Sequence, residues 1–220
     1  MYAPYVNRII RLVYEFEEVV VNQRSKTMAE NRAKLIFAAR KAFAEKGFAA
    51  SSMDDFTANA GLTRGALYHN FGDKRGLLAA VVEQIDSEMA VHAHEAGADA
   101  GGGWPGLLAE GAAYIKLALD PEVQRIVLLD GPAVLGDPSQ WPSQSSCLQS
   151  TKLTVEMLIA LGTVKQIDAE AAARLLSGAA LNAALWVAAS ANPKDVLPKA
   201  IEAFYALATG LLNTPPCSRV

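Results

Sequence analysis

The stretch that decides the fold is AGLTRGALYHNFGDK, residues 60–74. Gly61 marks a tight turn, and Thr63 stands where a hydroxyl group can cap the first N–H groups of a helix. Leu67 and Phe71 are one helical turn apart, so their side chains lie on the same side of that helix. The stretch therefore predicts a short helix after the turn, ending at the Gly-Asp pair near its close.

Two further helices are predicted upstream of this stretch. Ser52 followed by Asp55 three residues later is a pattern typical of a helix start, and an apolar stripe follows it. A longer helix begins near Asn31 and closes at Gly47, with an inner face made of Leu35, Ile36, Ala39 and Phe43. Two short helices separated by a Gly-containing turn have the proportions of a helix-turn-helix.

The outer face of the helix after the turn carries side chains suited to DNA. Arg64 can read a guanine or hold a phosphate, whereas Tyr68 and His69 have polar tips that suit phosphate oxygens. Gly65 has no side chain, so a DNA backbone could approach it closely. Lys74 lies at the start of the next helix, where its charge and free N–H groups would hold another phosphate. Each of these side chains taken singly could be an ordinary solvated surface residue. Their occurrence together in one motif favours contact with DNA.

The run of residues 33–78 resembles the DNA-binding domain of the TetR family of repressors. The resemblance is carried by Gly47-Phe48, by the SMDD run at residues 52–55 and by the stretch quoted above. It implies a homodimer in which three front helices bind a double-stranded operator with an inverted repeat, while rear helices form an effector pocket and the dimer interface. The candidate DNA-binding residues are Ser52, Thr63, Arg64, Gly65, Tyr68, His69 and Lys74. Phe56 and Thr57 depart from the family pattern, and we expect both to affect packing more than DNA contact.

Behind the motif the sequence predicts a larger helical part. A fourth helix with the stripe Leu78, Val81, Ile85 and Met89 should end in the Gly/Ala-rich segment 97–106, the best linker candidate. Further helices are predicted near 105–119, 121–130, 145–161, 168–190 and 194–212, with a mobile loop at 137–146. Tyr114-Ile115 and residues 130–136 also resemble a subset of the family, from which residues 137–141 depart.

Composition agrees with an all-α protein of this kind. Alanine is abundant and only 7% of residues are aromatic, which favours close-packed helices over strands. The net charge is -3, but residues 1–82 carry 12 basic and 8 acidic side chains, while residues 83–220 carry 8 and 15. A basic front and an acidic back fit a phosphate-binding module joined to one that does not meet phosphates. We expect an N-terminal extension at 1–28, a DNA-binding domain at 29–75 and an effector-binding and dimerisation domain at 76–213.

Other classes of protein find little support. Cys147, Cys217 and three His give no disulfide framework or metal spacing, so no metal and no cofactor is expected. No phosphate-cradling glycine loop or nucleophile elbow suggests an enzyme, and Asp54-Asp55 has a simpler role at a helix start. No apolar run approaches the roughly 18 residues of a membrane span, so a cytoplasmic protein is expected. A second rival, a ligand-blind architectural DNA binder, would need a more basic surface.

Four residues of the rear part are candidates for an effector pocket: Tyr114, Met157, Asn182 and Trp186. The alternative for each is plain core, because helical aromatics and Met usually pack there. Asn182 is the first choice, since it lies in the apolar stretch 179–189 and needs a hydrogen-bond partner if buried. A ligand, a water or a dimer mate could supply that partner.

The last two predicted helices have more apolar surface than one chain requires. The candidate dimer faces are Ala171, Leu175, Gly178, Ala179 and Leu185 on one helix and Ile201, Phe204, Ala208 and Leu211 on the next. Their small residues permit close helix approach, which is consistent with a four-helix bundle across a two-fold axis.

The front segment has two explanations. Ile9, Leu12 and Phe16 recur at helical spacing, so residues 5–21 could form an amphipathic helix. Met28 is a second possible start, in which case the preceding residues do not belong to the native protein. The sequence leaves both explanations open.

Overall fold

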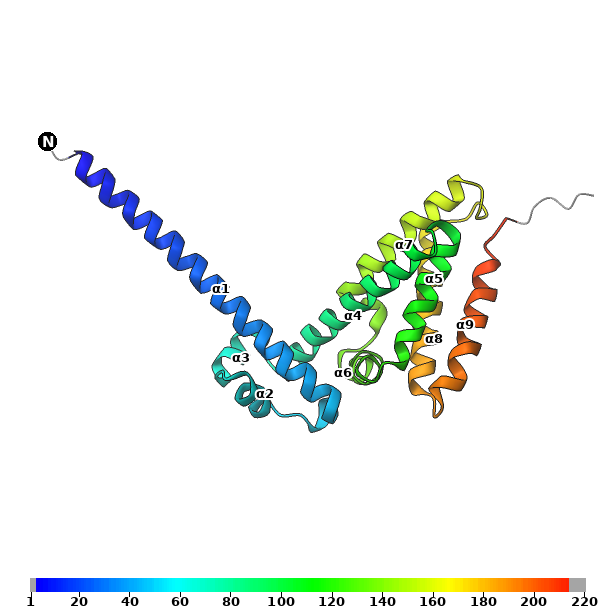
Figure 1. Ribbon diagram of the computed structural model, residues 1–220, viewed down its shortest axis with the longest axis horizontal. Helices are drawn as coiled ribbons and strands as arrows, with labels where there is room; N and C mark the ends of the chain where they lie inside the picture. The colour runs from blue at the N-terminus through cyan, green and yellow to red at the C-terminus, as the bar shows by residue number, and fades with distance from the viewer. Residues whose placement is uncertain (1–2, 214–220) are drawn as a thin grey trace, which may run out of the picture.

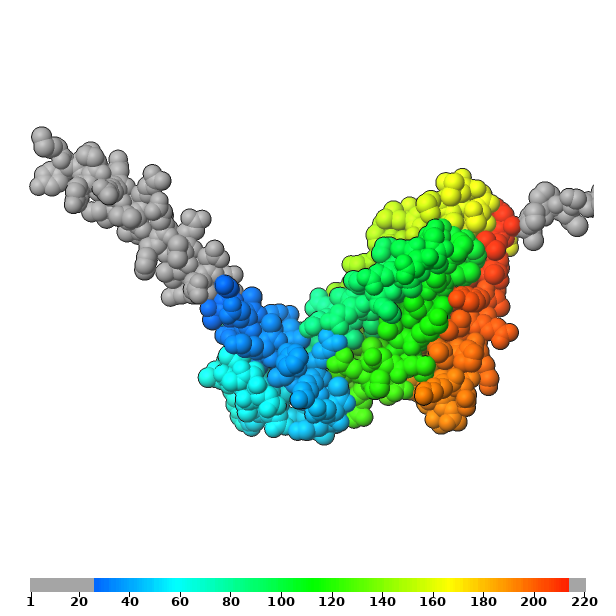
Figure 2. Space-filling model, in the orientation of Figure 1, coloured from blue at the N-terminus to red at the C-terminus, as the bar shows by residue number. Residues whose placement is uncertain are grey.

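The computed structural model describes the backbone of residues 3–213 and the side chains of residues 26–213. Within that part the chain forms nine α-helices and no β-strand, which confirms the all-α prediction. Helices α1 (Ala3–Ala50) and α4 (Lys74–Asp99) form the two arms of a V (Figure 1). Helices α2 (Met53–Ala60) and α3 (Arg64–Phe71) lie against α1 near the vertex. The later helices gather around α4 in a larger lobe (Figure 2).

The front helices share a small aromatic and aliphatic core. Leu35, Phe43, Phe56 and Leu67 are fully buried. The rings of Phe43 and Phe56 meet edge to face, with their centroids 5.2 Å apart. Leu78 of α4 joins the same cluster, so the first turns of α4 complete this core. The departure from the family pattern at Phe56 is therefore a packing feature, as expected from the sequence.

The boundaries of these short helices follow from their capping residues. Ser52 and Thr63 accept hydrogen bonds from the third residues of α2 and α3, and Asp73 does the same for α4. Gly61 adopts the left-handed conformation at φ 65°, which closes α2 and sets the turn before α3. Gly47, at φ 77°, interrupts the helical path of α1 where the sequence predicted its end.

The rear lobe is built on α8, which packs against α5, α7 and α9. Its elements are α5 (Gly103–Lys116), the 3-10 turn η1 (Leu117–Leu119), the π-helix η2 (Val123–Asp130), α6 (Gly131–Leu135), the 3-10 turn η3 (Pro138–Gln140), α7 (Pro142–Ala160), α8 (Ala169–Ala189) and α9 (Pro193–Thr209). Among the described helices, α8 alone is long and apolar enough to suit a membrane by composition. Its contacts with three neighbours are those of a core helix.

Two local predictions need correction. The expected α-helix at 121–130 is a π-helix from Val123, and the N–H of Gly131 bonds the carbonyl of Ile126, five residues back. Trp141 packs here so closely that a Cβ on Gly131 would lie 2.8 Å from its ring. The segment 137–146 is only partly a loop, because α7 begins at Pro142. Proline is favourable at the first position of a helix, since the N–H that it lacks would have no partner within the helix there.

The glycine-rich segment joins two helices of the same lobe. Helix α4 continues to Asp99, and α5 turns back to pack against it. A Cβ on Gly106 would lie 2.8 Å from the carbonyl oxygen of Gly97, so two glycines allow this close crossing. The segment is a turn inside the rear lobe, and α4 itself joins the two lobes.

The predicted front helix at 5–21 and the helix predicted to begin near Asn31 form one continuous helix, α1, so the expected start near Asn31 is wrong. The side chains of Ile9, Leu12 and Phe16 lie outside the described residues. Both explanations of the front segment therefore stay open.

Candidate DNA-binding surface and effector cavity

Helix α3 presents four of the predicted DNA-binding residues to solvent. Leu67 is buried and fixes the rotation of the helix. Arg64, Gly65, Tyr68 and His69 are all exposed, and 53% of Tyr68 is accessible. A short helix that is buried on one side and carries cationic and hydroxyl groups on the other has the form of a recognition helix.

Gly65 has almost no neighbour within the protein. A Cβ built at this position would meet only the hydroxyl oxygen of Thr63, at 3.7 Å, which is ordinary contact. Packing within the chain therefore does not require a glycine here. The backbone of this turn is open to close approach from outside.

Arg64 is held by a carboxylate from the preceding helix. Its guanidinium forms a two-pronged ion pair with Asp54 of α2. The hydrogen bonds from Arg64 hold the pKa of the Asp54 carboxyl below its usual value. The pair is exposed, so it orients the guanidinium on the outer surface without hiding it from a partner.

The remaining predicted DNA-binding residues lie at helix starts. The hydroxyl oxygen of Ser52 accepts the N–H of Asp55 at 3.1 Å, and that of Thr63 accepts the N–H of Ala66 at 3.2 Å. Lys74 lies across the Phe48 ring, with its Nζ 4.4 Å from the centroid. Its amine also donates to the carbonyl of Ala49 at 3.4 Å, so it is turned toward the front core more than the sequence suggested, and this partial burial lowers the pKa of Lys74.

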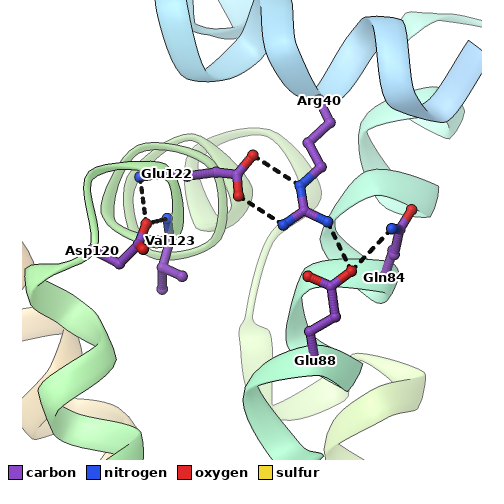
Figure 3. Close-up of polar contacts among 6 residues, drawn as sticks. All are labelled: Arg40, Gln84, Glu88, Asp120, Glu122 and Val123. Atoms are coloured by element: carbon purple, nitrogen blue, oxygen red, sulfur yellow. Dashed lines mark hydrogen bonds and ion pairs between the residues drawn. The ribbon is translucent and has the colours of Figure 1, made fainter. Parts of the chain in front are cut away.

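A charge cluster joins the front helices to the rear lobe. Arg40 of α1 donates to both carboxylate oxygens of Glu122, at 2.8 and 2.7 Å, and to Glu88 of α4 at 2.8 Å (Figure 3). Gln84 donates to the same oxygen of Glu88 at 3.0 Å. Asp120 accepts the N–H of Glu122 at 2.8 Å, which fixes the backbone at the start of η2. One guanidinium thus ties together α1, α4 and the approach to the π-helix.

The C-terminal end of α1 makes a second contact with η2. The N–H of Phe48 donates to Asp130 at 2.7 Å, and Arg125 donates to the carbonyl of Lys46 at 3.3 Å. A Cβ on Gly47 would lie 2.1 Å from the Arg125 guanidinium, so this glycine is needed for the contact as well as for its backbone angle. The π-helix therefore holds the end of the helix that carries the front core.

The rear lobe contains a cavity of about 590 Å³. A volume of this size suits a small molecule. Its walls come from α4, α5, α7, α8 and α9 and are mainly apolar, with Leu107, Leu108, Leu176 and Phe204 among them. Cys147 also lines it, and burial raises the pKa of that thiol, which keeps the thiol protonated.

Polar groups gather in one part of this cavity. Gln144 lines the wall, and its side-chain NH₂ donates to the two oxygens of Asp86, at 3.3 and 3.0 Å. The hydroxyl of Tyr114 is buried and has no hydrogen-bond partner within the described part of the chain. At the rim, His94 Nδ1 lies 2.8 Å from Glu110.

Of the four predicted pocket residues, only Tyr114 lines the cavity. Met157 of α7 and Asn182 and Trp186 of α8 point away from it and are exposed. Helix α8 is apolar on nearly every side, so its sequence does not show which side faces inward. The sequence missed Gln144 and Asp86, although an acidic residue inside the apolar stripe of α4 was a usable signal.

The outward residues of α8 form one continuous stripe. Three or four residues separate each exposed position from the next along Ala171, Leu175, Gly178, Asn182, Trp186 and Ala189. Leu175 is 76% accessible, and a Cβ on Gly178 would meet nothing within 4 Å. On α9 the expectation needs correction, because Phe204 and Ala208 are buried against the chain's own helices.

Comparisons with known proteins agree on both parts of the chain. Residues 35–81 match a family model described as bacterial regulatory proteins of the tetR family, and residues 104–211 match the tetracyclin repressor-like C-terminal domain. The crystal structure of a TetR-family transcriptional regulator from Pectobacterium atrosepticum has a TM-score of 0.79 and 46% sequence identity, covering 86% of this chain and 98% of that one. The transposon Tn10 TetC protein of Escherichia coli is 26% identical over 162 residues, which is 71% of this chain and 80% of its own length. The HTH-type transcriptional regulator TtgR of Pseudomonas putida is 36% identical over 75 residues, 34% of each chain.

Proposed function

Because the chain belongs to the TetR family of transcriptional regulators, we propose that it is a repressor that leaves its operator when a small, mainly apolar effector fills the rear cavity. DNA binding is the common activity of this family. The observation that carries the proposal is the outer face of α3, where Gly65 is free of any packing requirement and Tyr68 is exposed beside it.

On DNA, α3 enters the major groove with Gly65 at the point of closest approach. Arg64 reads a guanine edge, exchanging its ion pair with Asp54 for hydrogen bonds to the base. Tyr68 and His69 bond phosphate oxygens. Ser52, Thr63 and Lys74, at the starts of three helices, fix the register along the backbone.

Operator recognition uses two copies of the chain. The exposed stripe on α8 supports a dimer in which α8 and α9 of each copy pair across a two-fold axis. Asn182 lies within this stripe, so its amide meets the partner copy rather than the effector. The two-fold axis requires an operator that is an inverted repeat.

The effector acts through α4. This helix lines the cavity through Ala90, Ala93 and His94 and reaches the front core through Leu78. The effector must bind more tightly to the arrangement in which the recognition helices do not fit the operator. A difference of only about 1 to 3 kcal/mol in its binding free energy between the two arrangements is enough. The Arg40 cluster and the contacts of η2 with the end of α1 transmit the shift of α4 to the front helices.

The two rival functions are less well supported. An architectural DNA binder has no use for a mainly apolar cavity of this size. The family and fold are those of regulators rather than enzymes. A regulator of this kind works in the cytoplasm, where its operator lies.

The experiment starts from random duplex DNA, from which the purified chain selects its operator. Tyr68→Ala should then weaken binding to the selected DNA by about tenfold or more, since each lost contact to DNA costs of the order of 1–3 kcal/mol. Binding should also fall steeply with salt. Helix content and molecular mass should stay the same, and an unaltered gel-shift affinity would contradict the assignment.

A further inference from the structure

The cavity contains a hydroxyl group that has no partner. The Tyr114 oxygen is shielded from solvent and forms no hydrogen bond of ordinary geometry among the residues that the structure describes, although the Gln144 side chain lies close enough to lower the pKa of the phenol slightly. A buried hydrogen-bonding group left unsatisfied destabilises the folded state. Burial raises the pKa of the Tyr114 phenol, and the nearby Asp86 charge acts in the same direction. A bound molecule with a polar group at this place would remove the cost.

A buried carboxylate lies beside that hydroxyl. Asp86 is 1% exposed, and the side-chain amide of Gln144 is its hydrogen-bond donor. No Lys or Arg side chain within residues 26–213 forms an ion pair with it. A carboxylate that has left water is well stabilised only by an opposite charge or by several donors. Asp86 has neither, so this part of the cavity favours a positive charge.

The carboxylates in the otherwise mainly apolar wall add negative charge. Glu95 and Glu110 are among the lining residues, and His94 pairs with Glu110 at the rim. The lining contains no Lys or Arg. Tyr114 and Phe204 also line the cavity, and aromatic rings of this kind can attract a cation. A carboxylate or phosphate ligand would find no Lys or Arg there, and the one basic side chain, His94, is already paired with Glu110.

We infer that the effector is an organic cation: a mainly apolar molecule whose protonated amine lies at the Tyr114 and Gln144 end of the cavity, where Asp86 lies behind the Gln144 side chain. This inference rests on the proposed function and adds the charge of the ligand to it. The ammonium donates one hydrogen bond to the Tyr114 oxygen. It donates another to Asp86 by displacing the amide of Gln144, which separates this carboxylate from the cavity. The apolar body lies between Leu107 and Leu176.

The test uses three probes that share a phenyl ring on a short alkyl chain and carry a positive, a neutral and a negative head group: phenylbutylamine, phenylbutanol and phenylbutanoate. Their binding to the full chain is measured by calorimetry in the absence of DNA. The amine should bind at least about tenfold more tightly than the alcohol, because hydrogen bonds to charged groups are worth about 1.5 to 3 kcal/mol. The carboxylate should bind weakest of the three.

Two variants assign that preference to the buried end of the cavity. Asp86→Asn keeps the shape and removes the charge, and it should bring the amine-to-alcohol ratio close to one. Glu156→Gln removes an exposed acidic residue of α7 that does not line the cavity, and it should leave the ratio unchanged. If Asp86→Asn does not fold, the order of the three probes on the unaltered chain still decides the matter.

The inference is overturned if the amine does not bind, if the alcohol or the carboxylate binds as well, or if a folded Asp86→Asn variant keeps the ratio. A gel shift with the selected operator separates this result from the proposed function. An amine that binds the cavity without releasing DNA supports the inference and contradicts effector release. Normal operator binding without an amine preference contradicts the inference alone.

Discussion

Gly65 illustrates how a single residue reports on a partner outside the chain. Two neighbouring glycines are required by the structure of the chain itself. Gly61 has a left-handed backbone conformation, and Gly47 lies against Arg125, where a Cβ would clash. Gly65 has neither a positive φ nor a close neighbour. A helix position that lacks an internal need for glycine loses stability by having one. We therefore propose that the compensation lies in the close approach of DNA to this position.

Gly65→Ala should separate stability from DNA binding. The added methyl group has room inside the protein and favours the helix, so the free energy of unfolding should rise by about 0.5 to 1 kcal/mol. The same group should obstruct the DNA backbone and lower the operator affinity. Urea denaturation and gel shifts on one preparation measure both quantities. A stabilised variant that binds DNA as well as the unaltered chain would show that Gly65 does not contact the operator.

Single residues also show where sequence reasoning succeeds and fails. The roles of Ser52 and Thr63 at helix starts were predictable, because a cap depends on residues within one turn. The inward face of α8 was not, because Asn182 and Trp186 lie in a helix that is apolar nearly all round. Which side such a helix buries is decided by its neighbours, and no local pattern records their positions.

At the scale of elements, the junction depends on the π-helix η2 and the charges around it. The sequence predicted an ordinary helix here. In the structure the carbonyl of Ile126 bonds the N–H five residues ahead, where Trp141 packs closely against Gly131, and this tertiary contact leaves no local sequence signal. The widened turn carries Arg125 and Asp130, which hold the end of α1. A change in the rear lobe therefore reaches α1 directly, beside the path through α4.

Arg40→Leu should weaken this junction. The substitution leaves Glu122 and Glu88 without their shared cation. Because Arg40 is partly buried, the loss in the free energy of unfolding should be about 1 to 2 kcal/mol, more than for a surface ion pair. The control is Arg174→Leu, which breaks an exposed pair with Glu170 within α8 and should cost about 0.5 kcal/mol or less. Urea denaturation compares the two, and equal losses would contradict a special role for Arg40.

The same cluster predicts a dependence on pH. The hydrogen bond from Arg40 lowers the pKa of Glu88 in the folded state, so its contribution to stability is present at neutral pH. That contribution is lost as the pH falls through the lowered pKa. Acidification should therefore lower the free energy of unfolding of the unaltered chain more than that of Arg40→Leu. Urea denaturation of both proteins at neutral and acidic pH measures the two losses, and equal losses would contradict this prediction.

At the scale of the whole molecule, the two lobes share one continuous core. Residues of the front helices and of the rear lobe belong to the same buried cluster, and α4 contributes to both. The sequence indicated the two modules through its charge asymmetry but not how they join. Helix α4 packs in both lobes without interruption, because its buried residues Leu78, Val81, Ile85 and Met89 recur at helical spacing along its length.

The proposed dimer is the property of the whole molecule on which the proposed operator binding depends. Leu175 is 76% accessible in the single chain, so Leu175→Arg removes no contact within it and should leave helix content unchanged. Placed on the α8 stripe of both copies, the two added charges would be buried facing each other, which a helical interface does not tolerate. The variant should therefore sediment as a monomer at micromolar concentration and bind the selected operator poorly, because one recognition helix reads only half of an inverted repeat. Leu161→Arg is the matched control: Leu161 follows α7, is 70% accessible and lies off the stripe, so this variant should keep both the dimer and the affinity. If Leu175→Arg sediments like the unaltered chain, the two copies meet through another surface, and the spacing of the recognition helices must be set elsewhere.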